Sequence, residues 1–207
     1  MLAHLKVHIL SKTLLGATSH FFFVDLGPAR PIRDFVLDSS GDKLLPCPGG
    51  VVHLPGSPHE FVEWSSSSSD IRLVVDQKVV QVVEYAMTTC ATFADSNCLV
   101  TGSSDYTVRL WKISRGSNAV STRLSLSHIM RVHTGSVNCV AASRAWSLVV
   151  SGSNDGSAAL WDLNRGVYVR SIWHRNGEGQ SDPVNLVAIN ESTVRVQLLL
   201  GSELLLN

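Results

Sequence analysis

The chain has 207 residues, of which 44% are hydrophobic, and its 17 basic and 17 acidic residues cancel. This composition allows a sizeable core and argues against an intrinsically disordered chain. It also argues against a nucleic-acid partner, because nucleic-acid-binding surfaces carry a basic excess. Only 16% of the residues are charged, against about a quarter in a typical free domain, so part of the surface is expected to be covered.

The cysteines predict neither a zinc site nor a disulfide framework. They are widely spaced, with no Cys-x-x-Cys pair: Cys47, Cys90, Cys98 and Cys139. Free thiols of this kind are typical of a reducing compartment, so we expect a cytoplasmic protein.

Residues 1–33 form an N-terminal extension that no pattern assigns. The longest uncharged apolar stretch in it, residues 13–24, is too short to span a bilayer. His4 and His8 would share one side of a helix, as metal ligands do, but no third ligand accompanies them. We therefore predict no metal site here.

Residues 34–80 carry a weaker strand pattern and are interpreted as a degenerate repeat unit. A run of five serines, residues 65–69, precedes Asp70. We favour a flexible loop for this run, and the alternative is a phosphorylation site that changes the local charge.

Residues 84–130 contain a clearer β pattern. An apolar run at residues 98–102 meets a polar turn around Asp105, and a second β-rich run ends at Trp111. This order predicts a hairpin. Two further strands are expected before and after it, at residues 88–93 and 119–126.

Residues 133–175 repeat this pattern. Residues 100–116 and 150–166 are identical at eight of 17 positions, where chance would give about one. Asp155 lies in the second turn, and Trp161 ends the second run. The other strands are expected at residues 136–141, 147–152 and 167–172, and the polar, glycine-containing segment 176–182 is expected to be a loop.

Residues 183–207 begin a further unit. Residues 183–193 include a strand candidate, whereas residues 194–207 show no repeat pattern. We interpret this end as a truncated unit with an atypical tail, arising from a truncation or an incorrectly placed exon boundary.

Four short strands per unit, with Gly-x-x-Asp before Trp, are the pattern of a β-propeller blade. The chain resembles the WD-repeat family in these features, in its Trp161-Asp162 dipeptide and in His133 before the second unit. In that family a histidine, a serine or threonine, an aspartate and a tryptophan form a buried hydrogen-bonded tetrad. The resemblance implies that the tetrad here is His133, Ser151, Asp155 and Trp161.

The earlier unit matches this tetrad only in part. Its matching residues are Thr101, Asp105 and Trp111. Glu84 stands where the histidine should be, and Lys112 replaces the aspartate after the tryptophan. We therefore expect an incomplete tetrad in this unit.

A narrower resemblance lies in the sequence motifs of the second unit and of the segments around it. Residues 161–164 read WDLN and residues 189–193 read INEST, and upstream elements match at Phe61, Glu63 and Trp64. These features are similar to the WD-repeat segment of Beige and neurobeachin-like proteins, in which a BEACH domain precedes the repeats. The resemblance implies an all-β, partial propeller of about three four-stranded antiparallel blades plus an aborted one, within a longer protein.

This resemblance also implies a non-enzymatic scaffold that binds proteins in vesicle trafficking, membrane dynamics or autophagy. Membrane association would be indirect, peripheral to endomembranes, and no cofactor is implied. The alternative is a generic WD-repeat adaptor in a ubiquitin ligase or signalling complex.

Two further interpretations concern single residues. Ser151, Asp155 and His133 are the residue types of a hydrolase triad, which makes a hydrolase a remote alternative. No Gly-x-Ser-x-Gly motif or phosphate-binding loop supports catalysis.

Arg144 and Trp146 lie in a predicted turn, where an exposed tryptophan would be a partner contact. Packing of Trp146 against a neighbouring blade is the alternative.

Overall fold

A computed structural model of the chain describes the following residues: 6–14, 17–25, 34–37, 44–47, 49–55, 57, 59–65, 69–84, 86–116, 121–173, 181–190, 195–200 and 203–206. Within these ranges every regular element is a β-strand. The chain divides into two compact units, residues 1–47 and residues 48–207.

The first unit contains two antiparallel strand pairs. They are formed by β1 (Lys6–Leu14) with β2 (Ala17–Asp25), and by β3 (Asp34–Leu37) with β4 (Leu44–Cys47). His8 lies within β1, so the helical spacing considered for the histidine pair does not apply, and His4 lies outside the described residues.

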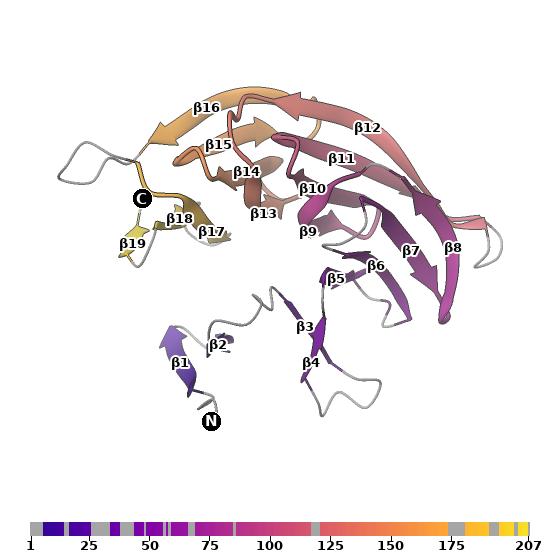
Figure 1. Cartoon of the computed structure of the whole chain (residues 1–207), viewed down its shortest axis with the longest axis horizontal. Coiled ribbons are helices and arrows are strands. Elements are labelled where there is room, and N and C mark those ends of the chain that lie inside the picture. Colours follow the sequence, from indigo (N-terminus) through magenta and orange to yellow (C-terminus); the bar gives the residue numbers. More distant parts are fainter. Residues whose placement is uncertain are drawn as a thin grey trace. The chain divides into compact units, whose positions relative to one another are not determined.

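The second unit is a series of antiparallel sheets in chain order, three with four strands and one with three (Figure 1). Sheet 1 comprises β5 (Gly49–His53), β6 (Glu60–Ser65), β7 (Ile71–Val75) and β8 (Lys78–Val83). Sheet 2 comprises β9 (Thr88–Asp95), β10 (Cys98–Ser103), β11 (Thr107–Ser114) and β12 (Arg123–Arg131). Sheet 3 comprises β13 (Val137–Ser143), β14 (Leu148–Ser153), β15 (Ser157–Asp162) and β16 (Val167–Trp173). Sheet 4 comprises β17 (Val184–Asn190), β18 (Arg195–Leu200) and β19 (Glu203–Leu206).

This arrangement confirms the expected all-β fold with four-stranded antiparallel sheets. In Figure 1 the first strands β9 and β13 lie on the inner side of the series, and the last strands β8, β12 and β16 form its outer side. The described sheets do not close into a ring.

Two segments differ from the expectations. Among the described residues, β3 and β4 pair with each other and with no further strand, so the first four-stranded sheet begins at Gly49 rather than at residue 34. The tail after residue 194 is not without pattern: β18 and β19 extend sheet 4. Val196 and Leu198, on one side of β18, are buried against sheet 3, which explains why this leucine-rich segment forms strands.

The core lies between successive sheets because the middle strands are covered on both sides. On β10, Leu99 packs against sheet 1 while its neighbour Val100 packs against sheet 3. On β14, Val149 and Val150 likewise face sheets 2 and 4. Consecutive apolar residues therefore point in opposite directions, and each fully buried side chain contributes roughly 1.5–3 kcal/mol.

Glycines allow the close approach of successive sheets. A Cβ on Gly102 would lie 2.5 Å from both the Cys90 Sγ and the Val137 Cγ1 of sheet 3. The contact recurs one sheet later, where a Cβ on Gly152 would lie 2.5 Å from Val184 Cγ1. The same stacking contact is thus encoded in both repeats.

Cys139 reinforces this contact. Its thiol donates a hydrogen bond to the Val184 carbonyl oxygen across 3.6 Å. Burial raises the pKa of the Cys139 thiol, which keeps the donor proton in place.

Candidate functional site

Four side chains of sheet 3 and the segment before it form a hydrogen-bonded chain. The Trp161 Nε1–H donates to Ser151 Oγ at 2.8 Å, and Ser151 Oγ lies 2.7 Å from His133 Nε2. His133 Nδ1 lies 3.1 Å from Asp155 Oδ2. Because a carboxylate only accepts, Nδ1 carries the proton and Nε2 accepts from the Ser151 hydroxyl. The structure thus brings together all four residues of the implied tetrad.

Asp155 anchors this chain to the backbone. Its Oδ1 accepts from the Ser157 N–H at 2.9 Å and the Ser157 hydroxyl at 2.6 Å, and its Oδ2 accepts from the Thr134 N–H at 2.8 Å. Burial alone would raise the pKa of Asp155, but these bonds and His133 hold it below its usual value. Asp155 is therefore an anion that fixes the turn between β14 and β15.

His133 is the neutral member of the tetrad. Burial lowers its pKa below the usual 6.5, against the opposing effect of Asp155. Its side chain has no exposed surface. A neutral imidazole can accept from Ser151 and donate to Asp155 at the same time, so both ring nitrogens have partners.

The geometry of Ser151, His133 and Asp155 has the order of a hydrolytic triad, but its burial decides its role. Ser151 is 0% exposed, and its oxygen already accepts the Trp161 N–H. A substrate carbonyl could reach Ser151 only if sheet 3 opened. The arrangement suits a structural hydrogen-bond chain.

Sheet 2 keeps half of this arrangement. The Trp111 Nε1–H donates to Thr101 Oγ1 at 2.9 Å, as Trp161 does to Ser151. Asp105 Oδ1 accepts from the Thr107 N–H at 3.1 Å and the Thr107 hydroxyl at 2.6 Å. Glu84, at the position of the histidine, is exposed.

Arg109 takes the place of the missing histidine in sheet 2. Its guanidinium donates to Asp105 Oδ2 and to the Ala86 carbonyl oxygen. Arg109 pairs with Thr101 across the strands, just as Ala159 pairs with Ser151 in sheet 3. The small Ala159 therefore leaves room for an imidazole, whereas Arg109 fills that room itself.

The sequence carried a signal for Arg109. It is a charged residue in the otherwise apolar run before Trp111, at the position of Ala159, and it lies four residues after Asp105. The tetrad pattern does not point to Arg109, because that pattern places the partner of the aspartate upstream of the sheet, whereas Arg109 lies on β11.

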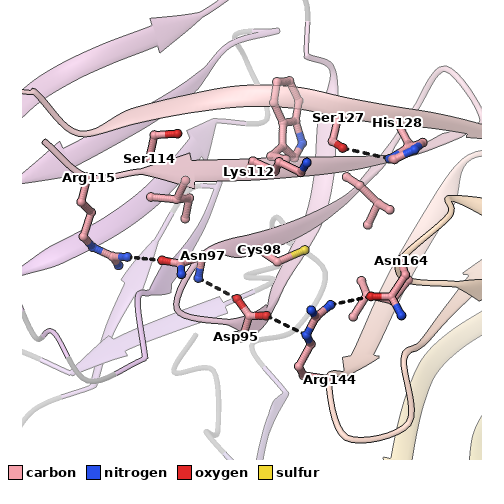
Figure 2. A pocket seen from close by; sticks show the side chains of 14 residues that line it. Asp95, Asn97, Cys98, Lys112, Ser114, Arg115, Ser127, His128, Arg144 and Asn164 are labelled. Carbon is pink, nitrogen blue, oxygen red and sulfur yellow. Dashed lines mark hydrogen bonds and ion pairs between the residues drawn. The ribbon is translucent and has the colours of Figure 1, made fainter.

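Arg144 and Trp146 lie in the turn between β13 and β14, as predicted. Arg144 Nε forms an ion pair with Asp95 Oδ2 of sheet 2 at 3.4 Å, and its NH1 donates to Asn164 Oδ1 at 2.7 Å (Figure 2). Arg144 thus connects two sheets. Trp146 is 48% exposed.

An open pocket of about 680 Å³, the inter-sheet groove, lies beside these contacts between sheets 2 and 3. Its side chains come from turns of both sheets, from β11 and, at Ser127 and His128, from β12 (Figure 2). Its polar residues include Asp95, Asn97, Lys112, Arg115, Arg144 and Asn164.

The described residues contain no group of three or more histidine, cysteine or acidic side chains placed to hold a metal ion. They also include no helix of the length and apolarity needed to cross a membrane. The serine run is described only at Ser65 and Ser69, and most of the loop expected at residues 176–182 lies outside the described residues.

Residues 80–112 and 124–162 match the WD40 family, "WD domain, G-beta repeat". The chain carries WD40 repeats. The fold agrees: the crystal structure of the WD40 β-propeller domain of Doa1 superposes with a TM-score of 0.59 and 14% identity, over 75% of this chain and 48% of that one. WD40 repeats typically serve as scaffolds for protein–protein interaction.

The relatives of this WD40 segment include very long proteins. It is 27% identical over 154 residues to Beige protein homolog 1 of Schizosaccharomyces pombe, covering 72% of this chain and 6% of that protein. It is 28% identical over 170 residues to BEACH domain-containing protein A2 of Arabidopsis thaliana, covering 79% and 5%. It is 30% identical over 144 residues to the human lysosomal-trafficking regulator, covering 64% and 4%. The similarity fits the WD-repeat segment of a BEACH protein.

Proposed function

We propose that this chain is the WD-repeat scaffold of a BEACH-type protein and binds partner proteins in vesicle trafficking, membrane dynamics or autophagy. The observation that carries the proposal is the similarity to the Beige homolog over 72% of this chain and to the lysosomal-trafficking regulator over 64% of it. In this proposal a BEACH domain precedes the repeats, and the protein works in the cytoplasm at the surface of endomembranes.

The surface of the sheets supports binding rather than catalysis. The best candidate nucleophile, Ser151, is buried and already hydrogen-bonded. Large apolar side chains are exposed on the outer strands, among them Val82 on β8, Leu126 on β12 and Trp173 on β16. Exposed apolar side chains of this kind are covered in protein complexes.

Proximity labelling tests the proposal. A biotin ligase fused to the chain should enrich membrane tethers, coat subunits or autophagy proteins over the same fusion carrying Trp161→Ala, which removes the buried indole of sheet 3. Enrichment of ubiquitin-ligase or signalling subunits instead would favour the generic adaptor. A hydrolytic activity lost in a folded Ser151→Ala variant would contradict a scaffold.

A further inference from the structure

We propose that the inter-sheet groove binds an acidic segment of a partner protein, with a carboxylate on Lys112 and an apolar side chain against Trp146. This inference rests on the proposed scaffold function and gives the chemistry of one partner.

The charges of the groove leave one cation uncompensated. Arg115 lies 3.4 Å from Glu60, and Arg144 lies 3.4 Å from Asp95, so both guanidinium groups have a carboxylate. Lys112 is exposed and forms no ion pair within the described part of the chain. A carboxylate entering the groove would therefore meet an available ammonium group.

Lys112 also departs from the repeat, because the equivalent residue of sheet 3 is an aspartate that shapes a turn. At the same position in sheet 3, Asp162 Oδ1 accepts the Asn164 N–H at 2.8 Å and the Arg165 N–H at 2.9 Å, which shapes the turn after β15. A lysine cannot accept these bonds. Lys112 thus exchanges a turn-forming anion for a cation that lines the groove (Figure 2).

The rim of the groove is held in place before any partner arrives. Arg115 donates to Asn97 Oδ1 at 2.6 Å, and the Asn97 N–H donates to Asp95 Oδ1 at 2.7 Å. The chain continues through Arg144 to Asn164 (Figure 2). Groups already ordered in this way lose little entropy on binding.

Trp146 supplies an exposed apolar side chain in the turn that carries Arg144 of this rim. It follows Arg144 by two residues in the same turn and is 48% exposed. Tryptophans at such positions often dominate the energy of a protein interface. A single surplus cation in a chain of zero net charge suits one carboxylate rather than the polyanionic backbone of a nucleic acid.

Binding of a defined peptide to the full chain tests the inference. The probe is a short fluorescein-labelled peptide of alternating glutamate and leucine, compared by fluorescence anisotropy with its glutamine counterpart. The glutamate peptide should bind at least about tenfold more tightly, and added salt should reduce the difference.

Matched variants locate the site. Lys112→Glu should weaken binding of the glutamate peptide at least about tenfold, whereas Lys78→Glu, an exposed lysine on β8, should change it less than about twofold. Trp146→Ala should weaken binding at least about fivefold, whereas Trp173→Ala, at a 59% exposed tryptophan, should not. Circular dichroism checks that each variant is folded.

Three results would overturn the inference: equal binding of the two peptides, equal effects of the two lysine variants, or Lys112-dependent binding to phosphatidylserine vesicles without peptide binding. If no peptide binds while trafficking proteins are still enriched in cells, the inference about the groove is wrong and the scaffold proposal stands. If no trafficking protein is enriched, the scaffold proposal itself fails.

Discussion

Sheets 2 and 3 repeat the same turn but hold its aspartate in two ways. Asp155 is held by His133, which reaches it from the segment before the sheet. Asp105 is held by Arg109, from the strand after the turn. The repeat therefore specifies an anion in the turn, while the partner of this anion can come from either of two positions.

The two solutions differ in charge. Sheet 3 buries a neutral imidazole, since burial lowers the pKa of His133. Sheet 2 buries the guanidinium group of Arg109, which pairs with Asp105. The centre of sheet 2 therefore depends on an ion pair, and the centre of sheet 3 depends on hydrogen bonds.

The largest expected difference comes from neutralising each aspartate. We expect Asp105→Asn to lower the free energy of unfolding by about 2–3 kcal/mol, because the Arg109 side chain, only 11% exposed, loses its counter-charge. Asp155→Asn should cost about 1–2 kcal/mol, because neutral His133 loses only part of its hydrogen bonding. Urea unfolding of both variants measures this difference. A larger effect for Asp155→Asn would contradict the comparison.

Acid should weaken sheet 3 before sheet 2. Because the folded pKa of His133 lies below 6.5, the unfolded chain binds its proton more readily. The contribution of His133 to the free energy of unfolding is therefore fully present above about pH 6.5. It falls as the pH drops below this value, by up to about 1.4 kcal/mol per pH unit. The rate of amide hydrogen exchange in β14 and β15, corrected for intrinsic rates, should rise as the pH falls from about 7 to about 5. In the His133→Gln variant this rate should not rise.

Sheet 2 provides the control for this measurement. Burial by itself would raise the pKa of Asp105, but bonds from Thr107 and Ser103 and the charge of Arg109 hold it below its usual value. Exchange of β10 and β11 should therefore stay constant until the pH falls below about 4. A parallel rise in both sheets at about pH 5 would contradict the assignment.

Thr88 marks where sheet 2 departs from its neighbours at the inner strand. Its hydroxyl is buried and has no hydrogen-bond partner among the described residues. The corresponding positions of the next two sheets are Val137 and Val184, whose side chains meet the preceding glycines. Thr88→Val should raise the free energy of unfolding by about 1 kcal/mol. Thermal unfolding of Thr88→Val, with Thr88→Ala as the control, tests this. If the valine variant is less stable than the original chain, the hydroxyl has a partner.

The smallest effect concerns the turns themselves. Tyr106 has a φ of 72°, in the left-handed region that favours glycine, and the same position of the turn in sheet 3 is Gly156, with a φ of 83°. Tyr106→Gly should stabilise the chain by about 0.5–1 kcal/mol, because the side chain no longer opposes this backbone conformation. Urea midpoints should move up for Tyr106→Gly and down for Gly156→Tyr. A loss of stability in Tyr106→Gly would mean that the tyrosine contributes contacts that outweigh the strain.

The hairpins of sheets 2 and 3 could be predicted because their turn and tryptophan residues recur at a fixed spacing. The partner of Asp105 was not predicted, because the tetrad pattern places that partner upstream of the sheet, whereas Arg109 lies four residues after Asp105 on β11. The strands β18 and β19 of sheet 4 were missed for another reason: Val196 and Leu198 alternate as strand residues do, but the segment lacks the turn and tryptophan residues of the repeat.

The central claim is that Arg109 performs in sheet 2 the role of His133 in sheet 3, and exchanging the two solutions tests it most directly. His133→Glu copies Glu84, and Ala159→Arg copies Arg109. Each change alone should destabilise sheet 3. The double variant should regain at least about 1 kcal/mol relative to the sum of the single losses in a double-mutant cycle. Strictly additive losses would contradict the claim.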